Sequence, residues 1–184
     1  MKNYLITDPS YYDTKEQFRR YLSTIYKNKK VDYACFRDKE NQNFIEYAED
    51  FLKISKQFGV EKTLLNTHLK LAKRLGFFGV HLTSTQFNKL SIAKEKNLFT
   101  VVSTHSLADI KEVKKLADAI TFSPIFKTPN KGRVKGVDEL KKAVDLAYPT
   151  KCFALGGIVT KKHIKECENM GAYGFASIRY FSVK

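Results

Sequence analysis

Eight short apolar runs recur along the chain, and each of the first seven is followed by a stretch with helical periodicity. These runs predict eight β-strands, at residues 4–7, 31–36, 63–65, 79–82, 99–103, 119–123, 152–155 and 173–177. The strands are too continuously apolar for an antiparallel sheet with one face in water, so we expect a parallel sheet covered by helices. Eight such strand–helix repeats predict an α/β fold, the (β/α)8 TIM barrel.

The predicted barrel is compact. At 184 residues the chain lies below the usual size of this fold, and only residues 178–184 follow the last strand, so the final helix is short or missing. The alternative is an open doubly wound sheet, which needs fewer strands. No long linker or low-complexity tract interrupts the repeats, so residues 1–184 are expected to form one domain. Apolar tail residues such as Phe181 are expected to pack on the barrel wall or against a second subunit.

The stretch from Phe99 to Gly132 predicts one complete strand–helix–strand unit. Its first strand ends in the polar residues 103–106, and its second stops at Pro124 and opens a loop that carries lysines. Between them, an amphipathic run has apolar side chains about one helical turn apart, at Leu107, Ile110, Val113 and Leu116. Because the carboxyl ends of parallel strands meet at one edge of the sheet, His105 and Lys131 are expected on the same rim.

The ends of the other strands add further polar residues to this rim. The candidate rim residues are Asp8, Arg37, Lys39, Asn66, Thr67, Ser84, His105, Thr128, Asn130, Lys131, Gly156, Gly157, Ser177 and Arg179. Together they supply several cations, two glycines that expose backbone amides, and one imidazole. Such a set suits a phosphate or carboxylate ligand and a proton transfer by histidine.

Each of these interpretations has a simpler alternative. Gly156 and Gly157 lie between a strand and a helix, where barrels commonly hold phosphate, but a tight turn also needs glycine. His105 is placed to move protons, but a histidine there also serves to hold the loop through hydrogen bonds. Arg37 and Lys39 could bind a ligand, but they are equally well explained as exposed residues of an ordinary solvated turn.

The bulk composition narrows the class of protein. Hydrophobic residues make up 43% of the chain, which is typical of a globular protein, and no apolar run is long enough to cross a membrane. The N-terminus lacks the pattern of a secretory signal. The three cysteines form no CxxC pair, which favours buried thiols in a reducing cytoplasm, and the sequence shows no Cys–His metal cluster.

The net charge of +14 raises the question of nucleic-acid binding. However, the lysines are spread over almost every predicted helix, and the aromatic residues fall within apolar runs instead of alternating with basic ones. Attraction of small anionic molecules such as phosphates is therefore the more economical explanation, and we expect neither a nucleic-acid nor a membrane partner.

Six motifs in order resemble the thiamine phosphate synthase/TenI superfamily of barrels over nearly the whole chain. They are LITD at 5–8, FRDK at 36–39, GVHL at 79–82, STHS at 103–106, SPIFKTPNKG at 123–132 and ALGGI at 154–158. The synthase branch joins hydroxymethylpyrimidine diphosphate to a thiazole phosphate and holds Mg²⁺ with aspartates. At the position where the resemblance places one of these metal-binding aspartates, this chain has Thr67. At the position of the other, directly after the GVHL motif, it has no acidic residue. Neutral side chains bind Mg²⁺ weakly.

The chain is more similar to the TenI branch, whose members aromatise a carboxythiazole phosphate and need no metal. This resemblance implies that His105 is the acid–base group and that no cofactor is used. It also implies phosphate binding around Gly156, Gly157 and the end of the last strand, at Ser177 and Arg179; an arginine at the latter position departs from the family pattern. Arg37, Lys39 or Lys131 could hold the substrate carboxylate.

Two alternative functions stay open. One is a synthase that uses Mg²⁺, and the other is a regulatory protein that binds thiazole phosphate without catalysis. The family resemblance also favours a homodimer.

Overall fold

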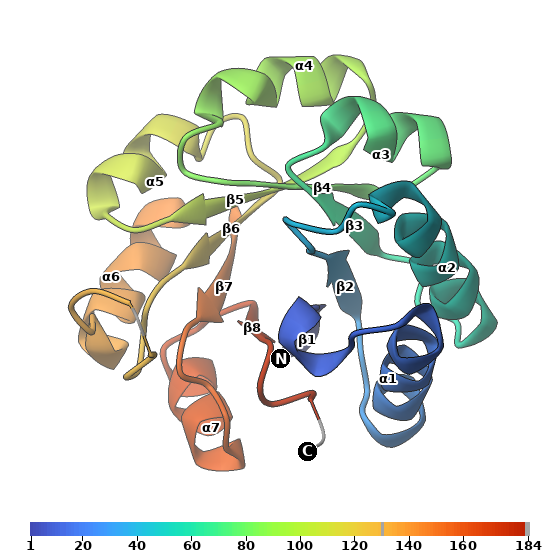
Figure 1. The fold of residues 1–184 in the computed structure, drawn as a ribbon. Helices are drawn as coiled ribbons and strands as arrows, with labels where there is room; N and C mark the ends of the chain where they lie inside the picture. Colours follow the sequence, from blue (N-terminus) through green and yellow to red (C-terminus); the bar gives the residue numbers. More distant parts are fainter. Residues whose placement is uncertain (130, 183–184) are drawn as a thin grey trace.

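A computed structural model describes residues 1–129 and 131–182; Asn130, one of the predicted rim residues, lies outside them. Eight parallel strands close into a barrel in sequence order (Figure 1). The strands are β1 (Lys2–Ile6), β2 (Tyr33–Phe36), β3 (Thr63–Asn66), β4 (Gly79–Leu82), β5 (Phe99–Thr104), β6 (Ala119–Phe122), β7 (Lys151–Leu155) and β8 (Gly174–Ser177). Because β8 pairs in parallel with β1, the barrel prediction is confirmed and the open-sheet alternative is wrong.

Helices form a ring around the barrel (Figure 1). The α-helices are α1 (Lys15–Asn28), α2 (Phe44–Gln57), α3 (Leu69–Leu75), α4 (Leu90–Glu95), α5 (Leu107–Val113), α6 (Gly136–Ala147) and α7 (Lys161–Asn169). Two 3-10 turns, η1 (Pro9–Tyr11) and η2 (Phe87–Lys89), complete the set. Among the described residues no α-helix follows β8, as the short tail predicts, and none of the described helices is long and apolar enough to cross a membrane.

Helix α5 is shorter than its apolar periodicity predicts. It ends at Val113, where the chain turns so that the amides of Leu116 and Ala117 both donate to the Val113 carbonyl. Only Ile110 and Val113 of the four periodic residues are buried, whereas Leu107 and Leu116 lie exposed. Leu116 thus leaves the buried face because the turn into β6 begins one helical turn early, whereas Leu107 lies exposed as the first residue of the helix.

The apolar core has two parts. One lies between the helices and the outer wall of the barrel, and the other fills the barrel interior. In the interior, the rings of Tyr4, Tyr33 and Phe153 pack edge to face, with centroids 5.2 and 5.3 Å from Phe153. Gly174 makes room for this packing, because a Cβ atom there would lie 2.5 Å from the Phe153 ring.

Above this aromatic layer the interior becomes polar. His81 of β4 is buried, with its Nδ1 2.7 Å from the Tyr4 hydroxyl and its Nε2 3.0 Å from Ser103 Oγ. Burial, assisted by the positive charge of Arg37, lowers the pKa of His81 to about 4. The imidazole is therefore neutral at neutral pH.

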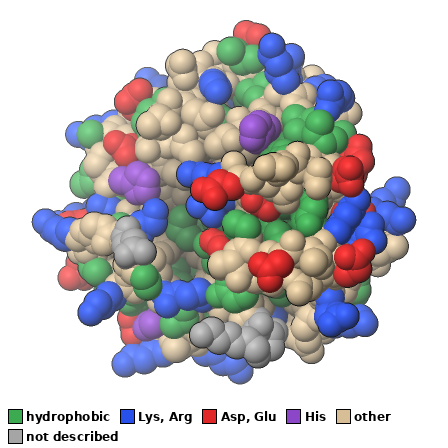
Figure 2. Space-filling view, viewed as in Figure 1, with side chains coloured by type: hydrophobic (Ala, Val, Ile, Leu, Met, Phe, Trp, Pro, Cys, Tyr) green, Lys and Arg blue, Asp and Glu red, His purple; other side chains and the backbone are tan. Residues whose placement is uncertain are grey.

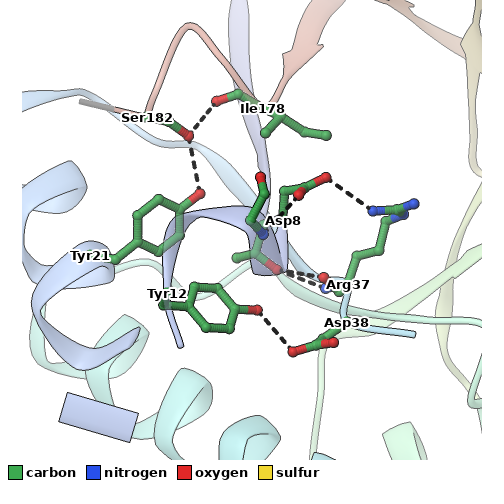
Figure 3. A network of polar contacts seen from close by, with 9 residues as sticks. Asp8, Tyr12, Tyr21, Arg37, Asp38, Ile178 and Ser182 are labelled. Carbon is green, nitrogen blue, oxygen red and sulfur yellow. Dashed lines mark hydrogen bonds and ion pairs between the residues drawn. The ribbon is translucent and has the colours of Figure 1, made fainter. Parts of the chain in front are cut away.

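The segment after β8 takes over part of the covering role of a final helix. Phe181 is fully buried and stacks on Phe175 of β8, with ring centroids 5.8 Å apart. Ser182 Oγ donates to the Ile178 carbonyl and lies 3.2 Å from the Tyr21 hydroxyl on α1 (Figure 3). These contacts confirm that the tail packs on the barrel wall.

Truncation of Phe181 should show how much this segment stabilises the barrel. Phe181→Ala removes a fully buried ring, so we expect the free energy of unfolding to fall by about 3–5 kcal/mol in urea titrations. The matched control is Ile92→Ala on α4. Because the Ile92 side chain is 44% exposed, its truncation should lower the free energy of unfolding by no more than about 0.5 kcal/mol. Equal losses in the two variants would contradict the structural role given to the tail.

The neutral state of His81 should make stability depend on pH. In the unfolded chain a histidine titrates near 6.5, so between pH 6.5 and 4 the unfolded chain binds a proton that the folded chain does not. Stability is full above pH 6.5 and should fall by roughly 2 kcal/mol on going down to pH 5. Urea titrations at several pH values check this, and His81→Gln should show a clearly flatter dependence. A slope unchanged in that variant would contradict the assignment.

Candidate active site

A pocket of about 770 Å³ opens at the carboxyl end of the barrel, lined by residues from the ends of all eight strands. Figure 2 shows this face, with a hollow near its centre and Lys and Arg side chains around it. All ten residues predicted to bind or transform a ligand line this pocket: His105, Arg37, Lys39, Asn66, Thr128, Lys131, Gly156, Gly157, Ser177 and Arg179. The sequence thus located them together, while their individual roles stay predictions.

The pocket carries a strong positive charge. Six lining side chains are cationic, and Asp8 is the one acidic lining residue within residues 1–129 and 131–182; the cations are Arg37, Lys39, Lys131, Arg133, Lys135 and Arg179. Asp8 Oδ2 lies 3.4 Å from Arg37 Nη1, so the single carboxylate is already paired (Figure 3). Such an excess of cations in a concave site attracts anionic ligands.

The backbone around Arg37 is held by Thr7, the residue directly after β1. Thr7 Oγ1 accepts a hydrogen bond from the Arg37 amide at 2.8 Å and donates to its carbonyl at 3.2 Å. The neighbouring Asp38 is buried and does not line the pocket, because its carboxylate accepts from the Tyr12 hydroxyl at 3.2 Å and from Asn41 at 2.9 Å. Figure 3 shows Asp38 and Tyr12 facing each other. The arginine is thereby presented to the pocket while the adjacent acid is held away from it.

Gly156 and Gly157 are required by close backbone packing. Both have positive φ, 96° and 71°, and a Cβ at Gly157 would lie 2.7 Å from the Phe126 carbonyl carbon. The Phe126 amide donates to the Gly156 carbonyl at 3.0 Å, which ties the loop after β6 to the loop after β7. A tight turn therefore explains the two glycines fully, and a phosphate role for them is an addition that stays a prediction.

Three other predicted residues have polar groups that are partly engaged within the protein. Ser177 Oγ donates to the Ile158 carbonyl at 2.8 Å and accepts from the Tyr180 amide at 3.1 Å, so its only hydroxyl hydrogen is already used. Asn66 Nδ2 donates to the His81 carbonyl at 3.1 Å, and Thr128 Oγ1 donates to the Phe126 carbonyl at 2.9 Å. These side chains shape the pocket, and what they offer a ligand is mainly acceptor oxygen atoms.

His105 is exposed directly after β5, and two groups of Ser123 contact its Nδ1. Its Nδ1 lies 3.3 Å from the Ser123 carbonyl oxygen and 3.2 Å from Ser123 Oγ. A carbonyl oxygen can only accept, so Nδ1 is the protonated nitrogen when it bonds there, and Nε2 keeps a lone pair. An imidazole in this state can remove a proton from a ligand in the pocket.

The backbone of His105 is held by Asp109 in the first turn of α5. Asp109 Oδ2 accepts from the His105 amide at 2.7 Å, and Oδ1 accepts from Ser106 Oγ at 2.6 Å. Partial burial tends to raise the pKa of Asp109, but the hydrogen bonds from Ser106 and the His105 amide outweigh it and lower this pKa. The carboxylate is therefore ionised at neutral pH and anchors the strand end.

The sequence prediction missed several lining residues. Ser103, Ser123, Arg133 and Lys135 all line the pocket, as does His81, which was expected only as a packed barrel residue. Ser103 could have been found, because it precedes His105 by two positions and therefore shares its face of the strand. Arg133 and Lys135 depend on the path of the loop after β6, which no periodicity reveals.

Among the described residues, the pocket offers a divalent cation one carboxylate, that of Asp8. Asp8 is engaged with Arg37, and in the part of the chain that the structure describes no three His, Cys, Asp or Glu residues come together to hold a metal ion. Mg²⁺ is usually bound through one or two carboxylates together with substrate phosphates. Thr67, at the position that the resemblance gives to a metal-binding aspartate, does not line the pocket.

Comparisons with known proteins agree with this fold. Residues 3–181 match the family described as "Thiamine monophosphate synthase" (TMP-TENI). A protein of Aquifex aeolicus named "Putative thiamine-phosphate synthase 2" is 35% identical, over 97% of this chain and 96% of that one. A Geobacter sulfurreducens protein named "Putative thiamine-phosphate synthase" is 31% identical over 77% of this chain and 68% of that one.

A solved structure supports the fold independently. The thiamine phosphate pyrophosphorylase from Pyrococcus furiosus superposes with a TM-score of 0.78 at 24% identity, covering 96% of this chain and 85% of that one. Such an identity shows the shared fold alone. The family match and the relatives show more, and on these the chain belongs to the TMP-TENI family of thiamine biosynthesis proteins.

Proposed function

We propose that this protein is a metal-independent thiazole tautomerase of the TenI type, which aromatises the carboxythiazole phosphate made by thiazole synthase. The observation that carries this proposal is the contact of His105 Nδ1 with the Ser123 carbonyl, which would leave Nε2 as a base in a pocket whose one described carboxylate is paired with Arg37. A tautomerisation needs one positioned base and no leaving-group stabilisation, so this set of residues suffices.

The chemistry follows from the substrate. The dihydrothiazole ring loses a proton from one carbon and gains one at another, so the reaction is balanced without an oxidant or a second substrate. Loss of the ring proton is favoured because an aromatic ring results. His105 Nε2 can accept this proton and return it, which is a role that a histidine fills near neutral pH.

The six cations suit the charges of this substrate. It carries a phosphate at one end and a carboxylate at the other, and both need counter-charges in the pocket. Lys131, Arg133 and Lys135 come from the loop after β6, while Arg37, Lys39 and Arg179 follow β2 and β8. Cations that come from three loops around the rim are compatible with a ligand that has two anionic ends.

A second candidate is thiamine phosphate synthase, and the names of the two relatives favour it. Arg37, Lys39 and Lys131 would suit its diphosphate substrate as well. What speaks against it is the donor set, because only Asp8 is acidic among the described lining residues. The synthase would therefore need metal ligands other than those that the family resemblance indicates.

A paired assay should separate the two candidates. One sample holds hydroxymethylpyrimidine diphosphate, aromatic thiazole phosphate and Mg²⁺, and is scored for thiamine phosphate. The other holds freshly made thiazole synthase product with EDTA, and is scored for aromatisation above the spontaneous rate. We expect turnover only in the second sample. Turnover in the first would overturn the tautomerase proposal, and silence in both would favour a thiazole-phosphate-binding regulator.

Removal of the base should abolish the proton transfer without removing the ligand site. His105→Ala should lower kcat for aromatisation by about 10²–10⁴-fold, which is the usual contribution of a general base. Binding of the aromatic product, measured by calorimetry, should stay close to that of the parent protein. His68→Ala is the matched control, because His68 does not line the pocket, and its kcat should be unchanged. Retention of activity by His105→Ala would show that another group is the base.

A further inference from the structure

Below the pocket, three side chains form a continuous hydrogen-bonded chain from the barrel interior to the ligand space. The hydroxyl oxygen of Tyr4, on β1, lies 2.7 Å from His81 Nδ1, and Ser103 Oγ, on β5, lies 3.0 Å from His81 Nε2. Tyr4 and His81 are buried, whereas Ser103 is half-buried and lines the pocket. The chain thus joins three strands and ends at the surface that a ligand would touch.

The direction of this chain follows from the Tyr4 hydroxyl. Tyr4 has no exposed surface, and burial together with the nearby Cys35 raises its pKa well above the ordinary value, so the phenol keeps its hydrogen. That hydrogen needs an acceptor. His81 Nδ1 is a strong acceptor at short distance, whereas the alternative, the Cys35 sulfur, is a weak one. Tyr4 therefore donates to Nδ1.

The remaining two hydrogen bonds are then determined. His81 is neutral because burial lowers its pKa, so it carries one ring hydrogen only, and this must be on Nε2 when Nδ1 accepts. Nε2 donates to Ser103 Oγ. Because His81 is the hydrogen-bond partner found for the Ser103 side chain among the described residues, the hydroxyl hydrogen of Ser103 is left to point toward a ligand.

We infer that Tyr4 and His81 are positioning residues that hold the Ser103 hydroxyl as a hydrogen-bond donor to the ligand. If His81 carried its hydrogen on Nδ1 instead, Ser103 would donate its hydroxyl hydrogen to Nε2. Its oxygen could then only accept a hydrogen bond from the ligand. The inference about hydrogen-bond direction stands on the geometry of the barrel interior. Its consequence for rate rests on the proposed tautomerase function.

The two histidines then have opposite tautomers with complementary effects. When His105 carries its hydrogen on Nδ1, as the proposed base requires, it offers Nε2 to the ligand, while His81 keeps its hydrogen on Nε2 and orients a donor. Ser103 of β5 and His105, directly after the strand, are two positions apart and both line the pocket. A base and a donor therefore approach the same ligand from adjacent positions, and a donor to a ring nitrogen or carboxylate would stabilise negative charge as the proton leaves.

The tautomer of His81 can be measured directly in the full chain. Long-range ¹⁵N–¹H correlation spectra distinguish Nδ1–H from Nε2–H, and with four histidines in the chain the His81 signals are assigned by their loss in His81→Gln. At pH 7.5 we expect the Nε2–H form. In Tyr4→Phe, where Nδ1 loses its donor, the signals should shift toward a mixture of both forms. An Nδ1–H form in the parent protein would overturn the inference.

A matched control excludes a general effect of losing a buried hydroxyl. Tyr33 is the register partner of Tyr4 in the barrel interior, but its hydroxyl contacts that of Tyr173 at 3.2 Å and not His81. Tyr33→Phe should therefore leave the His81 spectrum unchanged. A shift as large as that in Tyr4→Phe would overturn the specific role given to Tyr4.

The effect on rate provides the second test. Tyr4→Phe and Ser103→Ala should each lower kcat for aromatisation by about tenfold with little change in KM, and the double variant should lose no more than the larger single loss. Tyr33→Phe should keep the parent kcat. Additive losses, or a Tyr4→Phe enzyme of full activity, would overturn the positioning role. If the parent protein does not aromatise the substrate, the proposed function fails, and the tautomer spectra still decide the inference.

Discussion

The parallel pairing of β1 with β8 is the contact on which the rest of the molecule depends. It aligns Leu5 with Ser177 and closes the sheet, so that the carboxyl ends of all eight strands meet around one pocket. Residues as distant in sequence as Asp8 and Arg179 come to line the same pocket. Without closure the cations would lie along an open edge, and their charges would not converge on one ligand.

Closure also brings polar side chains of non-neighbouring strands together inside the barrel. The Tyr4 hydroxyl of β1 lies against His81 of β4, which in turn lies against Ser103 of β5. Buried polar groups are costly unless they are hydrogen-bonded. Within the described residues the Thr121 hydroxyl is the one buried side-chain polar atom without such a partner, so the polar groups of the interior are almost fully satisfied before any ligand binds.

Much of this arrangement could be read from the sequence. Apolar periodicity located the eight strands, and the rule that ligands bind at strand ends gathered ten pocket residues, because both depend on short-range pattern and chain order. What could not be read depends on loop paths and side-chain rotamers. The contact of His105 with Ser123, the internal use of the Ser177 hydroxyl and the position of Lys135 are of this kind. Sequence alone also leaves the tautomerase and synthase alternatives close, since both use the same cationic rim.

The placement of the two groups that can exchange hydrogen has a stereochemical consequence. Ser103 of β5 and His105, directly after it, line the same part of the pocket, whereas the lining residues Leu155 and Ile178 are apolar and cannot exchange a proton. A planar heterocycle held against this part of the wall would meet both groups on one face, and its proton would be removed from that side of the ring.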